Sequence, residues 1–283
     1  MMKKIKKVYV ITGSTSGIGY ELLKRLSNNN IVFAGYRSED KIKNWNFSEN
    51  VIPFYIDMSE SSSIKEASEY IKSKTNKINT LINVAGCVVA GAVEEINIKD
   101  IKYQFDVNTF SHLEFTQYLL PLLNESRVIN VSSMASYGIF LFIAPYCASK
   151  RALDILFNSM QLECNNKFKY ISVKPGAIAT PLWRKSVDIN AKTLSSDKYK
   201  KEYDYLIDNA YKNEKNGLSV SKVADIILKA DCVKNPKTSY IVGRDAFFAN
   251  FILYIPQDML NKLIKIGMKI KIKGYSHDKQ RFM

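Results

Sequence analysis

The chain has 283 residues, of which 46% are hydrophobic and 24% charged, a composition typical of a globular protein and not of a disordered or collagen-like chain. Its apolar runs are far shorter than the roughly 20 residues that span a bilayer, which argues against a membrane-spanning protein. The net charge of +14 lies largely in Lys3, Lys4, Lys6 and Lys7 and in residues 246–283. No arginine cluster with interleaved aromatic residues accompanies it, so nucleic acid is not an expected partner.

Cysteine and histidine usage points to an intracellular chain without a metal site. The four cysteines, at positions 87, 147, 164 and 232, form no CxxC pair and no metal-ligand spacing. Only two histidines are present, His112 and His277, and we expect His112 to be a packing residue. The apolar run Val8–Ile11 after the first lysines is too short for the ~7–15-residue core of a signal peptide. We therefore expect free thiols, a reducing compartment and a cytoplasmic location.

Apolar, β-branched runs alternate with helical patterns along the chain. The predicted strands are Val8–Ile11, Ile31–Ala34, Val51–Ile56, Thr80–Val84, Val128–Val131, Tyr170–Val173 and Tyr240–Val242. The predicted helices are Gly17–Ser27, Ser59–Lys74, Asp100–Leu119, Ala148–Cys164, Ser196–Tyr211 and Ser221–Ala230. Continuous apolar strands separated by helices predict a parallel sheet covered on both faces. The predicted fold class is therefore α/β, a doubly wound sheet of about seven strands, and we expect residues 1–245 to form a single domain.

A glycine-rich turn, TGSTSGIG at 12–19, follows the first predicted strand and opens a helix. Glycines allow a tight turn, and the free N–H groups at the start of the helix then face an anion such as a pyrophosphate. A plain tight turn is the alternative. The residues of this turn that we expect to bind a cofactor are Gly13, Ser14, Ser16, Gly17, Ile18 and Gly19.

Polar residues after the next strands point to a dinucleotide. Arg37 follows the second strand, where a cation suits the 2′-phosphate of NADP and an acid would suit the ribose of NAD. Glu39 and Asp40 lie past the strand end, so we favour NADP over NAD. Four residues close the third and fourth strands where the adenosine half would rest, although such residues also favour ordinary turns: Asp57, Asn83, Ala85 and Gly86.

The candidate catalytic groups lie in the stretch Tyr146-Cys147-Ala148-Ser149-Lys150. Positions i and i+4 share one face of a helix, so Tyr146 and Lys150 should meet. A cation ~5 Å from the phenol at an effective dielectric constant of ~20 supplies roughly 3 kcal/mol, which predicts a tyrosine pKa about two units below its usual ~10. Ser133 follows the fifth strand and can donate a hydrogen bond to a substrate carbonyl. Taken alone, this spacing also occurs by chance in surface pairs.

Together these motifs resemble the short-chain dehydrogenase/reductase family. The matching segments are TGSTSGIG (12–19), NVAG (83–86), Asn108, VINVSS (128–133), YCASK (146–150) and VKPGAIATP (173–181). The resemblance implies a Rossmann fold. It also implies a catalytic tetrad of Asn108, Ser133, Tyr146 and Lys150, in which Asn108 holds a water of the proton relay. It also implies that Tyr146 and Lys150 contact the cofactor, together with Pro175, Gly176, Ile178 and Thr180. Ser16 departs from the many NADP-dependent members that carry a cation there.

The resemblance implies hydride transfer between NADP and a carbonyl or alcohol, with a substrate lid within residues 180–217. A tail over 246–283 combines an apolar run with Leu260, Leu263, Ile264 and Met268 on one helical face. It can contact a membrane surface, cover the core or join subunits. Family members that act on steroids, retinoids or lipid-like carbonyls carry similar tails, which favours a hydroxysteroid- or retinol-dehydrogenase-like member with a hydrophobic substrate. We also expect a homo-oligomer. A ketoacyl reductase of fatty-acid synthesis and a non-catalytic NADP-binding regulatory protein are the alternatives.

Overall fold

Seven parallel strands form one sheet in the computed structural model of the protein, which describes residues 6–281, with side chains as far as residue 275. Lys3, Lys4 and the side chain of His277 lie outside the described residues. The strands are β1 (Val8–Ile11), β2 (Ile31–Tyr36), β3 (Val51–Tyr55), β4 (Thr80–Asn83), β5 (Ser126–Val131), β6 (Phe168–Pro175) and β7 (Ser239–Val242).

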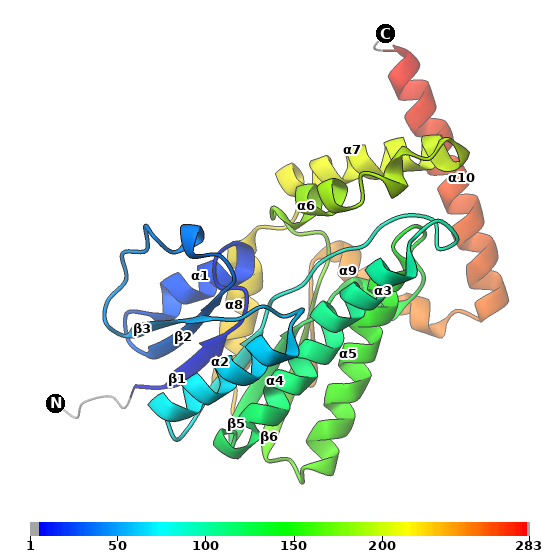
Figure 1. Cartoon of the computed structure of the whole chain (residues 1–283). Helices are drawn as coiled ribbons and strands as arrows, with labels where there is room; N and C mark the ends of the chain where they lie inside the picture. Colours follow the sequence, from blue (N-terminus) through cyan, green and yellow to red (C-terminus); the bar gives the residue numbers. More distant parts are fainter. Residues whose placement is uncertain (1–5, 282–283) are drawn as a thin grey trace.

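The order of the strands across the sheet is β3-β2-β1-β4-β5-β6-β7, and each adjacent pair is parallel (Figure 1). The order changes direction at β1, so the chain first builds outward to β3 and then returns past β1 to β4. This is the doubly wound topology that the alternating pattern predicts. Ligands bind in such sheets beyond the carboxyl ends of the strands, next to the change of direction.

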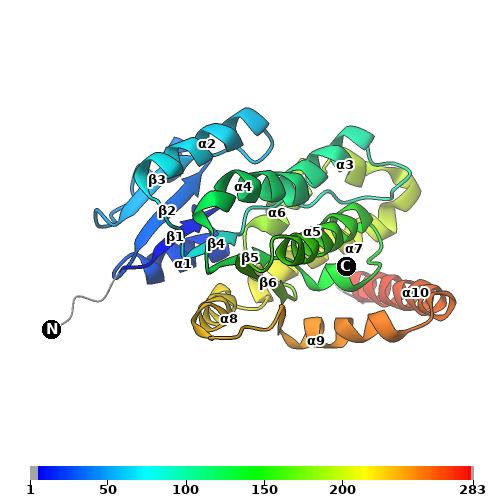
Figure 2. The same cartoon turned by 90° about the horizontal axis from the view of Figure 1, so that it is seen from below.

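Helices cover both faces of the sheet, as expected from strands that are buried on both sides (Figure 2). One buried apolar cluster joins the sheet to α2, α4 and α5, and a second joins it to α1 and α8. The helices are α1 (Gly17–Leu26), α2 (Ser61–Lys74), α3 (Ile98–Phe105), α4 (Ser111–Leu119), α5 (Ala144–Glu163), α6 (Leu182–Ile189), α7 (Lys200–Asn216), α8 (Val220–Cys232), α9 (Arg244–Asn250) and α10 (Gln257–Arg281).

Two helices differ from their predicted bounds in ways that affect the site. Helix α5 begins at Ala144, four residues before the predicted start, with Pro145 in its first turn, where proline needs no hydrogen-bond partner. The predicted helix over residues 100–119 is divided by a π-helical turn, Asp106–Phe110. Such turns add a residue to the helix and are frequent at functional sites.

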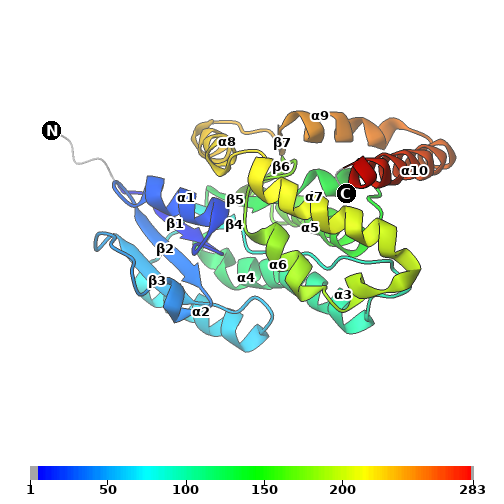
Figure 3. The same ribbon diagram turned by 90° about the horizontal axis from the view of Figure 1, so that it is seen from above.

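Between residues 180 and 217 the chain forms two helices, α6 and α7, joined by short 3₁₀ turns, where the sequence predicts a single helix. Figure 3 shows α6 and α7 crossing above the ends of the strands. A small apolar cluster of Ala92, Leu194 and Tyr203 holds this layer to the loop that follows β4. The layer therefore covers the edge of the sheet where a ligand is expected.

The last helix, α10, lies along the flank of the body and extends past α7 (Figure 1). Leu260 is buried, whereas Leu263, predicted to share its face, is 50% exposed. The Tyr275 hydroxyl donates a hydrogen bond to Asp208 of α7 at 2.5 Å. Among the described helices, none combines the length and the apolar character needed to cross a membrane.

Candidate active site

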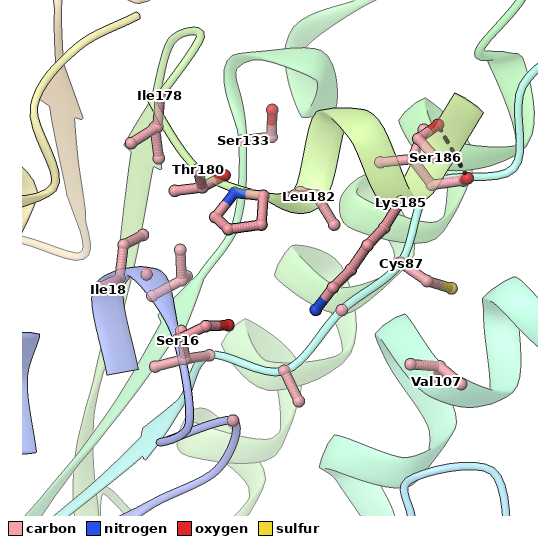
Figure 4. Close-up of a pocket in the computed structure, with 18 of the residues that line it drawn as sticks. Ser16, Ile18, Cys87, Val107, Ser133, Ile178, Thr180, Leu182, Lys185 and Ser186 are labelled. Atoms are coloured by element: carbon pink, nitrogen blue, oxygen red, sulfur yellow. Dashed lines mark hydrogen bonds between the residues drawn. The ribbon is translucent and has the colours of Figure 1, made fainter. Parts of the chain in front are cut away.

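A cavity of about 370 Å³ opens at the carboxyl ends of the strands. Its walls come from the glycine-rich turn, the loops after β2 to β6, and helix α6 (Figure 4). The structure brings most of the predicted residues together in its lining: Gly13, Ser16, Gly17, Ile18, Arg37, Asp57, Ala85, Gly86, Ser133, Tyr146, Lys150, Pro175, Gly176, Ile178 and Thr180. Four predicted residues lie behind this lining instead: Ser14, Gly19, Asn83 and Asn108.

The glycine-rich turn has the geometry that its sequence suggests. Gly13 has a φ of 67°, and a Cβ there would lie 3.1 Å from the backbone of Ala85. A Cβ on Gly19 would lie 2.3 Å from the carbonyl oxygen of Gly13, so this position admits only glycine. The hydroxyl of Ser14 points inward and donates to the Ile11 carbonyl at 2.9 Å. Ser14 and Gly19 therefore shape the turn and do not line the cavity.

The loop after β4 is fixed from two sides. The Thr12 hydroxyl oxygen accepts hydrogen bonds from the backbone N–H groups of Val84 and Ala85, at 3.0 and 3.3 Å. The ring of His112 donates from Nε2 to the Ala85 carbonyl at 2.9 Å. Burial lowers the pKa of His112 to about 3, so the ring is neutral at physiological pH. His112 is thus a packing residue, as predicted, and it holds the loop in place.

Asn108 lies in the π-helical turn and uses its amide to clamp the same loop. Its Oδ1 accepts from the Cys87 N–H at 2.9 Å, and its Nδ2 donates to the Cys87 carbonyl at 3.0 Å and to Ser149 Oγ at 3.1 Å. Asn83 is also internal, since its Nδ2 donates to Asn130 at 2.9 Å. Both amides therefore position the cavity wall from behind it.

Tyr146 and Lys150 share one face of α5, as their spacing predicts, and Lys150 Nζ lies 5.9 Å from the centre of the Tyr146 ring. The expected lowering of the tyrosine pKa is not found. Burial raises the pKa of Tyr146 to about 12, and a hydrogen bond with Ser133 offsets this only in part. The reason is that most of the Tyr146 side chain is buried in the cavity wall, which disfavours the phenolate. The Tyr146 phenol is therefore neutral at physiological pH.

The Lys150 ammonium points toward the strand β5. It donates a hydrogen bond to the Val131 carbonyl at 3.0 Å. Burial lowers the pKa of Lys150 to about 8, while the carboxylate of Asp154 one turn later works in the opposite direction. A Cβ placed on Gly86 would lie 3.6 Å from Lys150 Nζ, so the ammonium is close to the loop after β4.

Two cations that the sequence analysis does not single out also line the cavity: Lys41, in the turn after β2, and Lys185, in α6. The proximity of Lys41 to Arg37 in the sequence is a signal that could have found it. No spacing rule connects Lys185 to the β2 loop, because the fold alone brings α6 over that region. The Lys185 side chain extends from α6 into the cavity (Figure 4).

The part of the cavity beneath α6 is apolar. Its side chains come from the π-helical turn, the loop before α5 and the inner face of α6. They are Val107, Phe140, Ile143, Leu182, Trp183 and Ile189.

A doubly wound sheet with a glycine-rich turn and a buried Tyr–Lys pair at its carboxyl edge defines the class of dinucleotide-dependent enzymes. The family model for short chain dehydrogenases matches residues 7–190. A probable short-chain type dehydrogenase/reductase of Helicobacter pylori is 31% identical over 276 residues, which cover 92% of this chain and 98% of that protein. An NADPH-dependent 3-dehydrocapnine reductase of Ornithobacterium rhinotracheale is 27% identical over 274 residues, covering 92% and 96%.

The crystal structure of a short-chain dehydrogenase from Streptomyces avermitilis has the same fold, with a TM-score of 0.77 at 20% identity, covering 93% of this chain and 98% of that chain. The chain belongs to the short-chain dehydrogenase family. It is an NAD(P)-dependent oxidoreductase.

Proposed function

We propose that the protein is an NADPH-dependent reductase of hydrophobic carbonyl compounds, with Tyr146 as the proton donor. The observation that carries this proposal is the convergence of Ser133, Tyr146 and Lys150 in one cavity with the glycine-rich turn. The NADPH dependence of the relative from Ornithobacterium supports the choice of cofactor, as does the position of Arg37.

The residues present fit a dinucleotide. The turn of Gly13 and Gly17 leaves room for a pyrophosphate at the start of α1, where free N–H groups face the anion. Arg37 would hold the 2′-phosphate and Asp57 would lie beside the adenine. Thr180, Ile178 and the Pro175-Gly176 pair, which follow β6, would hold the nicotinamide end. When bound, the nicotinamide supplies the hydride.

The chain's own groups then handle the proton and the carbonyl oxygen. The neutral phenol of Tyr146 donates its proton to the substrate oxygen, which suits reduction better than oxidation because its pKa is about 12. The Ser133 hydroxyl donates a hydrogen bond to the same oxygen and orients the carbonyl. Lys150 would hold the ribose of the cofactor, and Asn108 keeps the loop after β4 in register through its bonds to Cys87.

Replacing Tyr146 with Phe tests this role. The variant should reduce a carbonyl panel about 10²–10⁴-fold more slowly, the usual contribution of a general acid, while its affinity for NADPH stays near that of the wild type. Tyr137→Phe is the matched control, because Tyr137 is buried nearby but does not line the cavity. Undiminished turnover in Tyr146→Phe would refute the proposal, and tight NADP binding without turnover in the wild type would favour a regulatory protein instead.

The apolar chamber beneath α6 supports a hydrophobic substrate. We infer that residues 180–217 form a lid over this chamber, which belongs to the single domain 1–245. A steroid, retinoid or lipid-like carbonyl suits such walls better than a sugar. The panel should therefore compare these three with sugar ketones and with ketoacyl thioesters. Preferred turnover of ketoacyl thioesters would favour the fatty-acid type of enzyme.

The tail supports peripheral contact with a membrane from a cytoplasmic location. We call Met259, Leu263, Ile266 and Ile270 the apolar stripe of α10; each is exposed by 49% to 66%. Four exposed lysines run beside it, which suits an anionic lipid surface: Lys262, Lys265, Lys269 and Lys273.

Co-sedimentation with vesicles tests this contact. Vesicles of phosphatidylglycerol and phosphatidylcholine should retain the protein, whereas pure phosphatidylcholine should not. Ile266→Asp should weaken binding, and Ile98→Asp, which changes an equally exposed residue of α3, should not. Equal retention of both variants would refute the contact.

We also infer a homo-oligomer, which the exposed Ile155 and Leu162 of α5 support. The mass in solution, measured by light scattering, tests this inference. A monomer over the working range of protein concentration would refute it.

A further inference from the structure

Three cations from separate parts of the chain converge on one end of the cavity. Arg37 directly follows β2, and Lys41 lies in the short turn after it. Lys185 comes from α6, on the opposite side of the opening. All three side chains line the cavity, so the β2 loop and α6 face each other across it with like charges.

The three cations differ from their neighbours in the sequence in how they pair with carboxylates. Lys43 pairs with Asp40 at 2.5 Å, and Arg184 lies 3.6 Å from Glu214. Within the part of the chain whose side chains the structure describes, residues 6–275, Arg37, Lys41 and Lys185 form no ion pair with a carboxylate.

Lys185 shows the effect of this crowding. Burial lowers its pKa, and repulsion from Lys41, then from Arg37 and Arg184, lowers it further. Arg37, Lys41 and Lys185 are all exposed, so solvent screens part of their repulsion. Positive charges gathered at one cavity still raise the free energy of the empty site, and a bound anion removes that cost. The arrangement is therefore suited to an anion of more than one charge.

The position of Lys185 is set by the attachment of α6 to the body. Ser186 Oγ and Asn190 Nδ2 both donate to the Val88 carbonyl, at 3.2 and 2.9 Å. The Trp183 indole donates to the Ile178 carbonyl at 2.6 Å. With α6 anchored in this way, Lys185 points into the cavity (Figure 4). Arg184, one residue earlier, does not line the cavity and lies beside Glu214.

We propose that Lys185 binds the 2′-phosphate of NADP from α6, together with Arg37 and Lys41 on the β2 side. This inference rests on the NADP dependence proposed above. It adds a residue of the lid to the site that distinguishes NADP from NAD.

The 2′-phosphate suits the three cations better than the pyrophosphate does. The pyrophosphate belongs at the start of α1, where the glycine-rich turn supplies free N–H groups. The ribose 2′ position belongs near the end of β2, which is where Arg37 and Lys41 lie. Of the cations around Lys185, Lys41 lowers its pKa the most, so the Lys185 ammonium lies close to the β2 side of the cavity.

Binding measurements on full-length variants test the proposal without relying on catalysis. Lys185→Ala should bind NADPH and adenosine 2′,5′-bisphosphate about tenfold to a hundredfold more weakly, the usual value of one charge-assisted hydrogen bond. Its affinity for NADH should stay near that of the wild type. Arg184→Ala, which removes the same charge from the next position of α6, should change none of these affinities, and Lys185→Arg should restore part of the loss.

Binding of a 2′-phosphate beside α6 can be followed through Trp183. The chain has two tryptophans, so a Trp45→Phe background leaves Trp183 of α6 as the single reporter. Adenosine 2′,5′-bisphosphate has no nicotinamide to quench the indole, and it should change the Trp183 emission in this background. The same ligand should produce no change once Lys185→Ala is added, even at saturation.

The outcomes separate this inference from the proposed function. An equal loss of NADPH and NADH affinity in Lys185→Ala would overturn it, because the lysine would then serve the shared pyrophosphate. A variant that keeps the full preference of the wild type for NADPH would also overturn it, and the reductase proposal would stand. A wild type that binds NADH as tightly as NADPH would refute the NADP assignment itself and this inference with it.

Discussion

Replacing Lys150 with Met should stabilise the protein near neutral pH while removing a group from the candidate active site. Burial lowers the pKa of Lys150 from 10.5 to about 8, so an ammonium at this position costs free energy in the folded state. The difference between the two values corresponds to about 3 kcal/mol. Losing the hydrogen bond from Nζ to the Val131 carbonyl costs about 1 kcal/mol. The net gain expected near neutral pH is therefore about 2 kcal/mol.

This gain depends on pH with a definite sign. Between pH 8 and 10.5, the unfolded wild type keeps the proton of Lys150 while the folded wild type has released it. The free energy of unfolding of the wild type therefore rises with pH in this window. Lys150→Met has no such group, so its gain in the free energy of unfolding over the wild type is complete below pH 8. This gain falls by about 3 kcal/mol as the pH rises to 10.5.

Urea titrations followed by tryptophan fluorescence, at several values between about pH 7 and about pH 10.5, measure this difference. Lys65→Met, at an exposed lysine of α2, controls for the loss of a positive charge. A difference between wild type and Lys150→Met that stays constant over the whole range would refute the reasoning.

Other positions test the buried ion pair and the glycines. Asp154 lies 2.8 Å from Lys174, and both are buried. Asp154→Asn should therefore lower the free energy of unfolding by about 3–5 kcal/mol. A loss below about 1 kcal/mol in urea titrations would contradict this. Gly19→Ala should abolish NADPH binding in a fluorescence titration, because its Cβ would meet the Gly13 carbonyl; retained affinity would argue against the tight turn. Gly267→Ala meets no atom within 4 Å and should stabilise α10 by up to about 1 kcal/mol, so a lower melting temperature would contradict its helical placement.

The sheet and most of the cavity could be predicted from the sequence because local patterns determine them. Each apolar run was long enough to identify a strand, and the carboxyl ends of parallel strands meet at one edge of a sheet. Residues such as Gly13, Gly86 and Ser133 follow three different strands, so the topology alone brings them together.

The properties that depend on side-chain direction could not be predicted in this way. The spacing of Tyr146 and Lys150 places both on one face of α5, but it does not show that Lys150 Nζ turns to the Val131 carbonyl or that most of the Tyr146 side chain is buried. These two facts reverse the expected change of the tyrosine pKa. The approach of Lys185 to Lys41 is likewise a product of tertiary structure, since over a hundred residues separate them.

The sequence placed Leu263 on the same face as Leu260, but α10 has two apolar faces. Leu260 packs on the body, whereas Leu263 belongs to the outward stripe. A periodicity of 3.6 residues shows that apolar side chains lie on one side of a helix. It does not show which of two adjacent rows of side chains on that side packs against the core.

The contact between α10 and α7 makes the tail and the proposed lid mechanically dependent on each other. The Tyr275 ring lies 5.8 Å from that of Tyr205, and its hydroxyl reaches Asp208, both on α7. An opening motion of α7 must therefore either carry α10 with it or break these contacts. Under the lid proposed above, whatever holds the tail in place would also affect how easily a reactant enters and a product leaves.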